Sequence, residues 1–420
     1  MHVVAPGIYS PGLRALLLLS ACAVVSSGLA INVAAEQLPA RTYTTTDGLT
    51  GNVVMGLAVD SRRFLWVSTR DGLSRFDGSQ FTSYGVADGL PTAMVNGILE
   101  TRAGIYWVET NKGACRFNPR GRRSTEANRS EPLFTCLHVG DSSITNRVNA
   151  FVDDRRGRLW AGTDGGLFQL ESHDGRDSFR PVRLPFVPPD HTAGAVHTGL
   201  EDAEGNVWFA ADWGVTRVLP DRQVVLYRVR SAGANEAATA LAIDAAKRLW
   251  IGYSGGVIVL EPDAAAIFAG LEGPVERVLE PPARTVSPHR TGGRTAGGTV
   301  TAWYTQAQGV PAGGVNALIS GTDGSIWLAS GNGLSRYSNG TFRTYTRANG
   351  LADNRVNFAG TNLQVDTLQR LHPWKGFRDP RHPQCHGGGR FRARLLCHAA
   401  SPWSERASAD STRRRRNSRR

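Results

Sequence analysis

The sequence predicts an all-β protein in which one four-stranded unit recurs about six times, and three observations support this fold class. Glycine accounts for 48 of 420 residues and only 20% of the residues are charged, a composition typical of turn-rich β-proteins rather than of helical bundles. Hydrophobic residues make up 41% of the chain, enough to bury a core, which excludes wholesale disorder. The third observation is a tryptophan that recurs along the chain, always with a glycine six positions after it.

Six of the ten tryptophans mark this repeat, at successive spacings of 41, 53, 48, 42 and 77 residues: Trp66, Trp107, Trp160, Trp208, Trp250 and Trp327. The glycines that follow them are Gly72, Gly113, Gly166, Gly214, Gly256 and Gly333. Internal repetition at such a period predicts a stack of similar supersecondary units rather than several unrelated domains.

Each unit is expected to contain four strands. The tryptophan lies in an unbroken apolar run, as in Leu249-Trp250-Ile251, which predicts a strand buried on both faces. An apolar strand that ends in a polar turn precedes it, and a third strand follows the glycine, which is expected to adopt a positive φ in a tight turn. A fourth strand is clear in three units, at residues 81–84, 224–227 and 342–345.

Four short antiparallel strands every 40 to 50 residues or so are typical of a β-propeller blade. Stacked radially, each blade covers its neighbour, which explains a strand buried on both faces. We therefore predict a β-propeller of six to seven four-stranded blades over residues 36–360, with a solenoid as the alternative.

Three segments carry a resemblance to a known family: residues 65–78, 88–98 (Asp-Gly-Leu-Pro-Thr-Ala-Met-Val-Asn-Gly-Ile) and 158–167. They resemble the two-component regulator propeller repeat, which builds the periplasmic sensor half of bacterial hybrid histidine kinases. The resemblance covers about residues 41–360 and weakens in the second unit, at Glu109 and Cys115, and in the fifth, at 253–255. It implies an extracytoplasmic sensor that works with a kinase half.

Two insertions and an unfinished unit interrupt the pattern. Residues 284–299 and 120–132 have no strand pattern and are expected to form long loops at outer blade edges. A seventh unit begins at Leu351 and lacks its tryptophan strand, while residues 41–44 look like an outer strand without partners. The ring is therefore expected to be incomplete, and it could stay open with exposed strand edges.

The N-terminus is expected to be an export signal over residues 1–35. Arg14 precedes an uncharged stretch from 15 to 35 that ends in small residues, a pattern typical of a secretory signal peptide. Two alternatives stay open: residues 19–22 fit a lipoprotein signal with a lipid on Cys22, and 21 residues can just span a bilayer as an uncleaved anchor. All three place the remaining chain in the periplasm or another extracytoplasmic space, with membrane contact only through the signal or its lipid.

Cysteine use agrees with export. Cys115 and Cys136 lie in two strand-like segments that could form a hairpin, so a disulfide between them is plausible in an oxidising compartment, with two buried free thiols as the alternative.

The net charge of +12 belongs to the C-terminal tail rather than to the repeats. Residues 361–420 contain 14 basic and 4 acidic residues, which leaves the first 360 nearly neutral. We expect this tail to be disordered, either as a frameshifted end or as a natural appendage, and we expect no nucleic-acid partner. Its Cys-His pairs at 385–386 and 397–398 match no common zinc spacing, so neither metal nor cofactor is expected.

The repeats show no catalytic constellation. No phosphoacceptor-histidine motif, ATP-binding glycine box or helix-turn-helix pattern is visible, and among the histidines only His197 falls on an inner strand, where a hydrogen-bonded packing role is the simpler interpretation. We therefore expect a non-enzymatic protein.

A binding surface remains. The loops after the tryptophan strands and the loops between blades should share one rim, which could bind an oligosaccharide or a peptide, with the two aromatic residues stacking on a sugar face. Its candidate residues are Arg70, Asp71, Asn111, Lys112, Asp164, Asp212, Trp213, Tyr253 and Asn332. The predicted function is ligand recognition for a two-component system whose kinase half is absent from this chain. The alternative is a free-standing exported propeller that acts as a protein-interaction scaffold.

Overall fold

The computed structural model describes residues 40–121, 132–186, 194–231, 234–262, 275–281, 294–295, 298–356 and 394–395. The chain divides into two units, residues 1–37 and 38–420, and the following concerns the second. The expected signal at 1–35, with Cys22, lies outside the described residues. No helix within the described ranges is long and apolar enough to cross a membrane.

Six sheets, each built on four antiparallel strands, form the fold. Blade 1 contains β2 (Val54–Val59), β3 (Leu65–Thr69), β4 (Gly72–Phe76) and β5 (Phe81–Tyr84). Blade 2 contains β6 (Val95–Glu100), β7 (Tyr106–Thr110), β8 (Gly113–Phe117) and β9 (Phe134–Leu137). Blade 3 contains β10 (Val148–Asp153), β11 (Leu159–Thr163), β12 (Gly166–His173) and β13 (Arg176–Pro181).

The second half repeats this plan with extra strands. Blade 4 contains β14 (Val196–Glu201), β15 (Val207–Ala211), β16 (Gly214–Val218), β17 (Val224–Ser231) and β18 (Ala234–Glu236). Blade 5 contains β19 (Ala238–Ile243), β20 (Leu249–Tyr253), β21 (Gly256–Pro262), β23 (Arg294–Thr295) and β24 (Gly298–Tyr304). Blade 6 contains β25 (Val315–Ser320), β26 (Ile326–Ser330), β27 (Gly333–Ser338) and β28 (Thr341–Tyr345).

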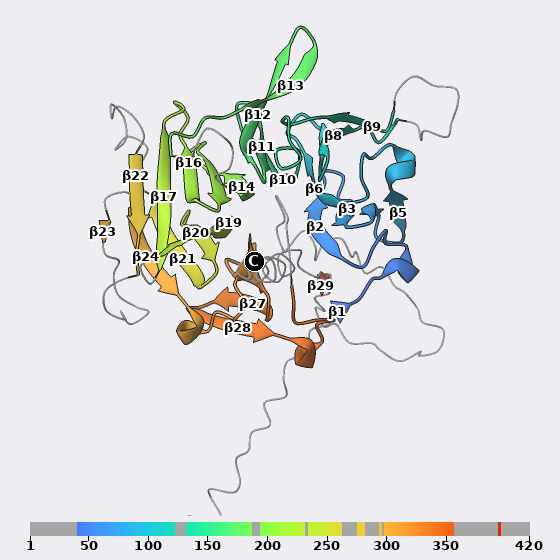
Figure 1. Ribbon diagram of the computed structural model, residues 1–420. Coiled ribbons are helices and arrows are strands. Elements are labelled where there is room, and N and C mark those ends of the chain that lie inside the picture. The colour runs from blue at the N-terminus through green and yellow to red at the C-terminus, as the bar shows by residue number, and fades with distance from the viewer. Residues whose placement is uncertain are drawn as a thin grey trace, which may run out of the picture. The chain divides into compact units, whose positions relative to one another are not determined.

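The sheets are arranged around a central axis, as Figure 1 shows. The first strand of each blade lies innermost, and these six inner strands together line a central channel. The predicted β-propeller is therefore confirmed, with six blades, and the solenoid alternative is wrong.

Hydrophobic packing between blades explains the tryptophan repeat. The described residues form six hydrophobic clusters, and each cluster combines side chains from two neighbouring blades. Trp66, for example, is 1% exposed and lies 5.5 Å from the ring of Phe117 in the next blade. A four-stranded sheet can hide both faces only in such a stack, because each blade is the cover of the next.

The glycine after each tryptophan strand opens the turn between the second and third strands. All six have positive φ, between 111° at Gly166 and 155° at Gly256. A side chain would also collide, since a Cβ on Gly214 would lie 2.4 Å from the carbonyl oxygen of Tyr227 on the outer strand. Both the backbone conformation and the close approach therefore require glycine.

Short 3₁₀ helices connect several blades: η1 (Thr45–Asp47), η2 (Val86–Asp88), η4 (Gln306–Gln308) and η5 (Arg347–Asn349). Each ends at a glycine with φ near 100°, followed by a buried Leu or Val that enters the next interface. The backbone N–H of Thr45 donates to Asn52 at 2.9 Å, and that of Arg347 donates to Asn354 at 2.8 Å. The start of the expected seventh unit therefore folds like the start of the first.

Blades 6 and 1 meet through a shared hydrophobic cluster. It contains Trp327 of blade 6, Leu65 and Val67 of blade 1, and Leu351 and Val356 from the unfinished seventh unit. Leu351 and Val356, which follow blade 6 in the chain, therefore pack at the junction between the last blade and the first.

An insertion in blade 5 reaches the outer edge of blade 4. The strand β22 (Val275–Leu279) follows β21 in the chain but pairs in parallel with β17. The stretch 284–299 was expected to lack strands, and this is wrong at its end, because β23 and the start of β24 lie inside it. These residues pair at the outer edge of blade 5. The Gly-, Arg-, Thr- and Pro-rich composition of the stretch does not indicate this pairing. Of the shorter insertion, residues 122–131 lie outside the described part.

Near the N-terminal end of the second unit, β1 (Ala40–Arg41) pairs in parallel with β29 (Arg394–Leu395). The outer strand expected at 41–44 is thus formed only at its first residue, and its partner comes from the tail. Tyr43 instead packs its ring 5.3 Å from that of Phe76 in blade 1. Apart from β29, the expected disordered tail from 361 lies outside the described residues.

Candidate functional site

The turns after the tryptophan strands and the connectors between blades share one face, here called the rim. Hydrogen bonds join the two sets: the N–H of Asp164 donates to the carbonyl of Arg147 at 3.1 Å, and that of Asp212 to Ala195 at 3.0 Å. Eight of the nine candidate residues lie in turns of this rim, and Tyr253 is the last residue of β20, next to such a turn.

Hydroxyl side chains shape four of these turns. Thr69, Thr110, Thr163 and Ser330 each donate to the carbonyl of the glycine three residues later, at 2.8 to 3.0 Å. Each oxygen also accepts a backbone N–H two residues on, at 3.1 Å. The turn is thus fixed from inside, which leaves its tip residues to face outward.

Two rim carboxylates organise their neighbours. Asp164 accepts from the Arg147 guanidinium at 2.6 Å and from the Asn149 amide at 2.9 Å. Asp212 accepts from the backbone of Ala195 at 2.8 Å and from His197 Nε2 at 2.7 Å. Burial opposes ionisation of Asp212, but the hydrogen bonds from His197 and Ala195 outweigh it and lower the pKa of that carboxyl.

The two aromatic candidates do not face solvent. Trp213 is 8% exposed and donates its indole N–H to Thr216 at 2.9 Å, while Tyr253 is 1% exposed and accepts from the Trp303 indole at 2.8 Å. The expectation that they stack on a sugar is therefore wrong, because both rings are already packed against the protein.

The remaining candidates form a polar surface. Asp71, Lys112, Asp212 and Asn332 are exposed, whereas Arg70, Asn111 and Asp164 are half-buried. The Asn111 amide oxygen accepts from Asn96 at 2.9 Å. Recognition at this rim would depend on hydrogen bonds and charges rather than on aromatic stacking.

A set of inner-strand residues went unnoticed in the sequence. A β-bulge lies at the second residue of every inner strand. Asn96 donates to the carbonyl of Val148 at 2.7 Å, Asn149 to Val196 at 3.0 Å, and Asn316 to Val356 at 3.0 Å. The signal was available, because a Val-Asn pair opens three of the inner strands.

Glu109 is a second residue whose role was missed, although it stood out as a departure from the repeat. It is 3% exposed, lines the central channel and accepts the backbone N–H of Phe151 from the next blade at 2.8 Å. Burial raises the pKa of this carboxyl to about 8, despite the hydrogen bond from Phe151. Gly97 leaves space for the carboxylate, since a Cβ there would lie 2.1 Å from Glu109 Oε2.

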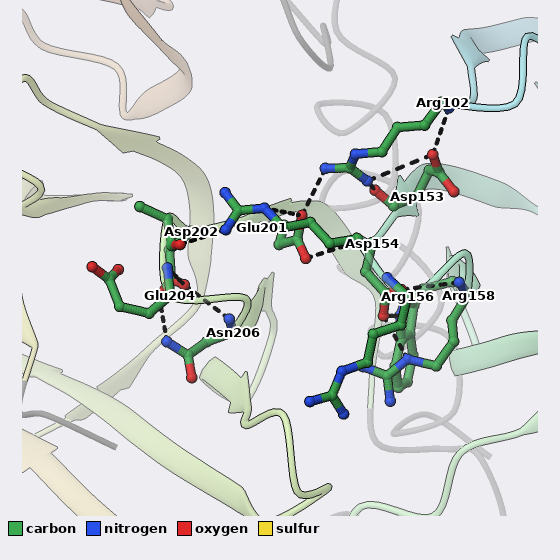
Figure 2. A network of polar contacts seen from close by, with 12 residues as sticks. Arg102, Asp153, Asp154, Arg156, Arg158, Glu201, Asp202, Glu204 and Asn206 are labelled. Atoms are coloured by element: carbon green, nitrogen blue, oxygen red, sulfur yellow. Dashed lines mark hydrogen bonds and ion pairs between the residues drawn. The ribbon is translucent and has the colours of Figure 1, made fainter. Parts of the chain in front are cut away.

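The opposite face carries arginine–carboxylate links between blades (Figure 2). Arg102 of blade 2 contacts Glu201 of blade 4 at 2.6 Å, and its backbone N–H donates to Asp153 of blade 3 at 2.7 Å. The backbone of Arg155 donates to the same Glu201 at 2.8 Å. These bonds hold three consecutive turns in fixed relative positions.

Cys115 and Cys136 form a disulfide between β8 and β9, where they are paired directly across the strands. It ties the outer strand of blade 2 to its neighbour. Over the described ranges, no group of three or more His, Cys, Asp or Glu side chains could hold a metal ion.

The family model of the two component regulator propeller matches residues 142–165. This segment runs from the connector before β10 to the turn after β11, so it contains one inner strand, one tryptophan strand and one rim turn. Residues 142–165 therefore match one copy of the two-component regulator propeller repeat. No curated protein matches the chain in sequence.

Several solved structures resemble this repeat propeller. An extracellular domain from B. thetaiotaomicron assigned to a hybrid two component system is 15% identical with a TM-score of 0.49, over 74% of this chain and 36% of that one. PorZ of Porphyromonas gingivalis, a surface component of the type-IX secretion system, is 16% identical at 0.50, over 76% and 45%. Virginiamycin B lyase from Staphylococcus aureus is 10% identical at 0.50, over 74% and 91%. The propeller thus spans about a third of the first of these and under half of the second, and at these identities the likeness concerns the fold alone.

Proposed function

We propose that the propeller is the extracytoplasmic ligand-recognition module of a two-component signalling protein and that it performs no catalysis itself. The observation that carries this proposal is the family match at residues 142–165, because it ties this repeat to two-component regulation. A kinase half would be the signalling partner, and export would place the module in the periplasm.

The rim supports a recognition role. Exposed Asp71, Lys112 and Asn332 stand on turns that internal hydrogen bonds hold, and exposed Asp212 is bonded to Ala195 of the adjacent connector. Functional residues on loops of a rigid scaffold are typical of binding proteins. With both candidate aromatics buried, the ligand we favour is an oligosaccharide held through its hydroxyl groups, and a peptide is the second candidate.

Calorimetric titration of the full chain with neutral oligosaccharides and peptides tests this function. We expect micromolar-range binding of one oligosaccharide, weakened about tenfold or more when Lys112→Ala and Asn332→Ala are combined. Arg222→Ala, in the turn between β16 and β17 on the opposite face, is the matched control and should bind normally. No heat with any member of either panel would overturn the recognition role.

The signalling role has its own test. Reading the genomic DNA past codon 360 in all frames should reveal a membrane span and a histidine kinase. Their absence would favour the exported scaffold instead.

A further inference from the structure

A groove on blade 2 lies away from the rim, beside the turn between β6 and β7. Its lining includes Trp107, Arg116 and Arg120 together with Glu100, Tyr106 and Asp177. Asp177 belongs to blade 3, whose long hairpin of β12 and β13 extends outward from the ring (Figure 1). The groove therefore has walls from two blades.

Other blades show what normally occupies the corresponding position beside the tryptophan. In blade 3, Asp154 Oδ2 accepts from Arg158 Nε at 2.6 Å (Figure 2). The same oxygen accepts from the Trp160 indole N–H at 3.0 Å. In blade 5, Asp244 Oδ2 accepts from the Trp250 indole at 2.9 Å and from Arg248 at 2.7 Å. A carboxylate held between an indole N–H and a guanidinium is thus a recurring feature of this repeat.

Blade 2 lacks that carboxylate. Thr101 takes the place of the aspartate, and its hydroxyl still closes the turn by accepting the N–H of Ile105 at 3.1 Å. A threonine is too short to reach the indole, and among the described residues no acceptor is bonded to the indole N–H of Trp107. The Trp107 indole N–H therefore lacks the aspartate acceptor that Trp66, Trp160, Trp208 and Trp250 have.

The arginine of blades 3 and 5 is replaced by Ile105 in blade 2, but the neighbouring strand supplies a guanidinium from another position. Arg116 is paired directly opposite Trp107 on β7 and β8, so both side chains lie on the same sheet face. The equivalent arginine of blade 6, Arg336, contacts Asp323 in its own turn at 2.6 Å. Arg116 is exposed and has no carboxylate partner in the described part of the chain, and the Arg120 side chain, also exposed, has none either.

We propose that this groove binds a hydroxylated carboxylic acid, whose carboxylate occupies the position that aspartate holds in blades 3 and 5. The Trp107 indole N–H and the Arg116 guanidinium would donate to it, and Arg120 would add a second positive charge. Charge-assisted hydrogen bonds of this kind are the strong ones, and a planar guanidinium matches a carboxylate in shape.

The acidic residues of the groove define the rest of the ligand. Glu100 and Asp177 line the same groove, so a second carboxylate would be repelled while hydroxyl groups could donate to them. One carboxylate next to several hydroxyls describes a sugar acid such as a uronate. An acidic peptide, with a carboxylate on every residue, fits this distribution of charge less well.

Titration of the full chain with D-glucuronate, and with D-glucose as its neutral match, tests the proposal. We expect glucuronate to bind and glucose to bind at least about tenfold more weakly, because glucose lacks the charged acceptor. Arg116→Ala should reduce glucuronate affinity by a similar factor. Thr101→Asp should abolish binding, because the new carboxylate would occupy the site from within.

Three controls keep the result unambiguous. Arg180→Ala removes an exposed strand arginine outside the groove and should leave binding unchanged, as should Thr101→Ser. The rim variant Lys112→Ala should also have no effect, which separates this site from the proposed sensor site. Circular dichroism should show the same fold in all variants.

Either of two outcomes would overturn the proposal. The first is glucuronate binding that is as strong in Thr101→Asp as in the natural chain. The second is a tetraglutamate peptide that binds more tightly than glucuronate at this site.

Discussion

Trp160 donates its indole N–H to the carboxylate of Asp154 across 3.0 Å, and Trp66, Trp208 and Trp250 make the same bond to the aspartate six residues before them. The aspartate also accepts backbone N–H groups of its own turn, for example from Arg158 at 2.9 Å. A single side chain therefore fixes both the turn and the buried indole.

Replacing the aspartate should destabilise the blade. Asp154→Asn keeps the shape of the side chain but loses the charge that Trp160 and Arg158 share, so we expect about 1–3 kcal/mol less stability in urea unfolding. Asp174→Asn, at the exposed hairpin tip of blade 3, should change stability little. Equal losses in the two variants would contradict this role for Asp154.

Glu109 should make stability depend on pH. Its pKa of about 8 in the folded protein exceeds the ordinary value of 4.5, so the folded state holds a proton that the unfolded chain releases. Its contribution is complete below pH 4.5 and is lost as the pH rises to about 8, at up to about 1.4 kcal/mol per pH unit.

Unfolding midpoints of the natural chain and of Glu109→Gln, measured between pH 5 and 8, check this expectation. The unfolding midpoint of the variant should vary less with pH across this range, because glutamine does not titrate. Glu171→Gln, an exposed residue, should follow the natural chain. A Glu109→Gln curve parallel to that of the natural chain would exclude a buried, protonated Glu109.

The rim turns should not tolerate a side chain at the glycine. Gly214→Ala places a Cβ 2.4 Å from a carbonyl oxygen at a φ of 118°, so we expect a loss of more than about 2 kcal/mol. Gly157→Ala is the control for conformation alone, since its φ is 73° but nothing lies within 4 Å of the added atom. It should cost about 1 kcal/mol. Thermal unfolding that ranks the two variants in reverse order would refute the close contact.

Reduction should loosen the outer edge of blade 2. The disulfide closes a segment of 21 residues, so its loss should cost about 3 kcal/mol of stability. A reductant should therefore lower the melting temperature of the natural chain and leave that of the double variant Cys115→Ala, Cys136→Ala unchanged. A double variant that still responds to the reductant would place the effect at another cysteine.

The features that local chemistry determines could be predicted from the sequence. The tryptophan strands and the glycine turns depend on residues within a few positions of each other, so their pattern is visible along the chain. Glycine at position 214, for example, is required by a turn of its own blade.

Features that depend on distant partners could not be predicted. Trp213 lies in a rim turn and Tyr253 beside one, positions that suggest exposure. Yet the Trp213 indole donates to Thr216, and Tyr253 contacts Trp303, fifty residues later and beyond an insertion. The groove of blade 2 likewise depends on a distant partner, because Asp177 of blade 3 forms part of its wall.

The parallel pairing of β22 with β17 binds part of blade 5 along the outer edge of blade 4. Under a pulling force applied through the chain ends, a ring of independent blades would peel away one at a time. Here the parallel pair of β17 and β22 joins the fourth and fifth blades and would be loaded in shear. A single-molecule extension trace should therefore show these two blades unfolding together in one longer step.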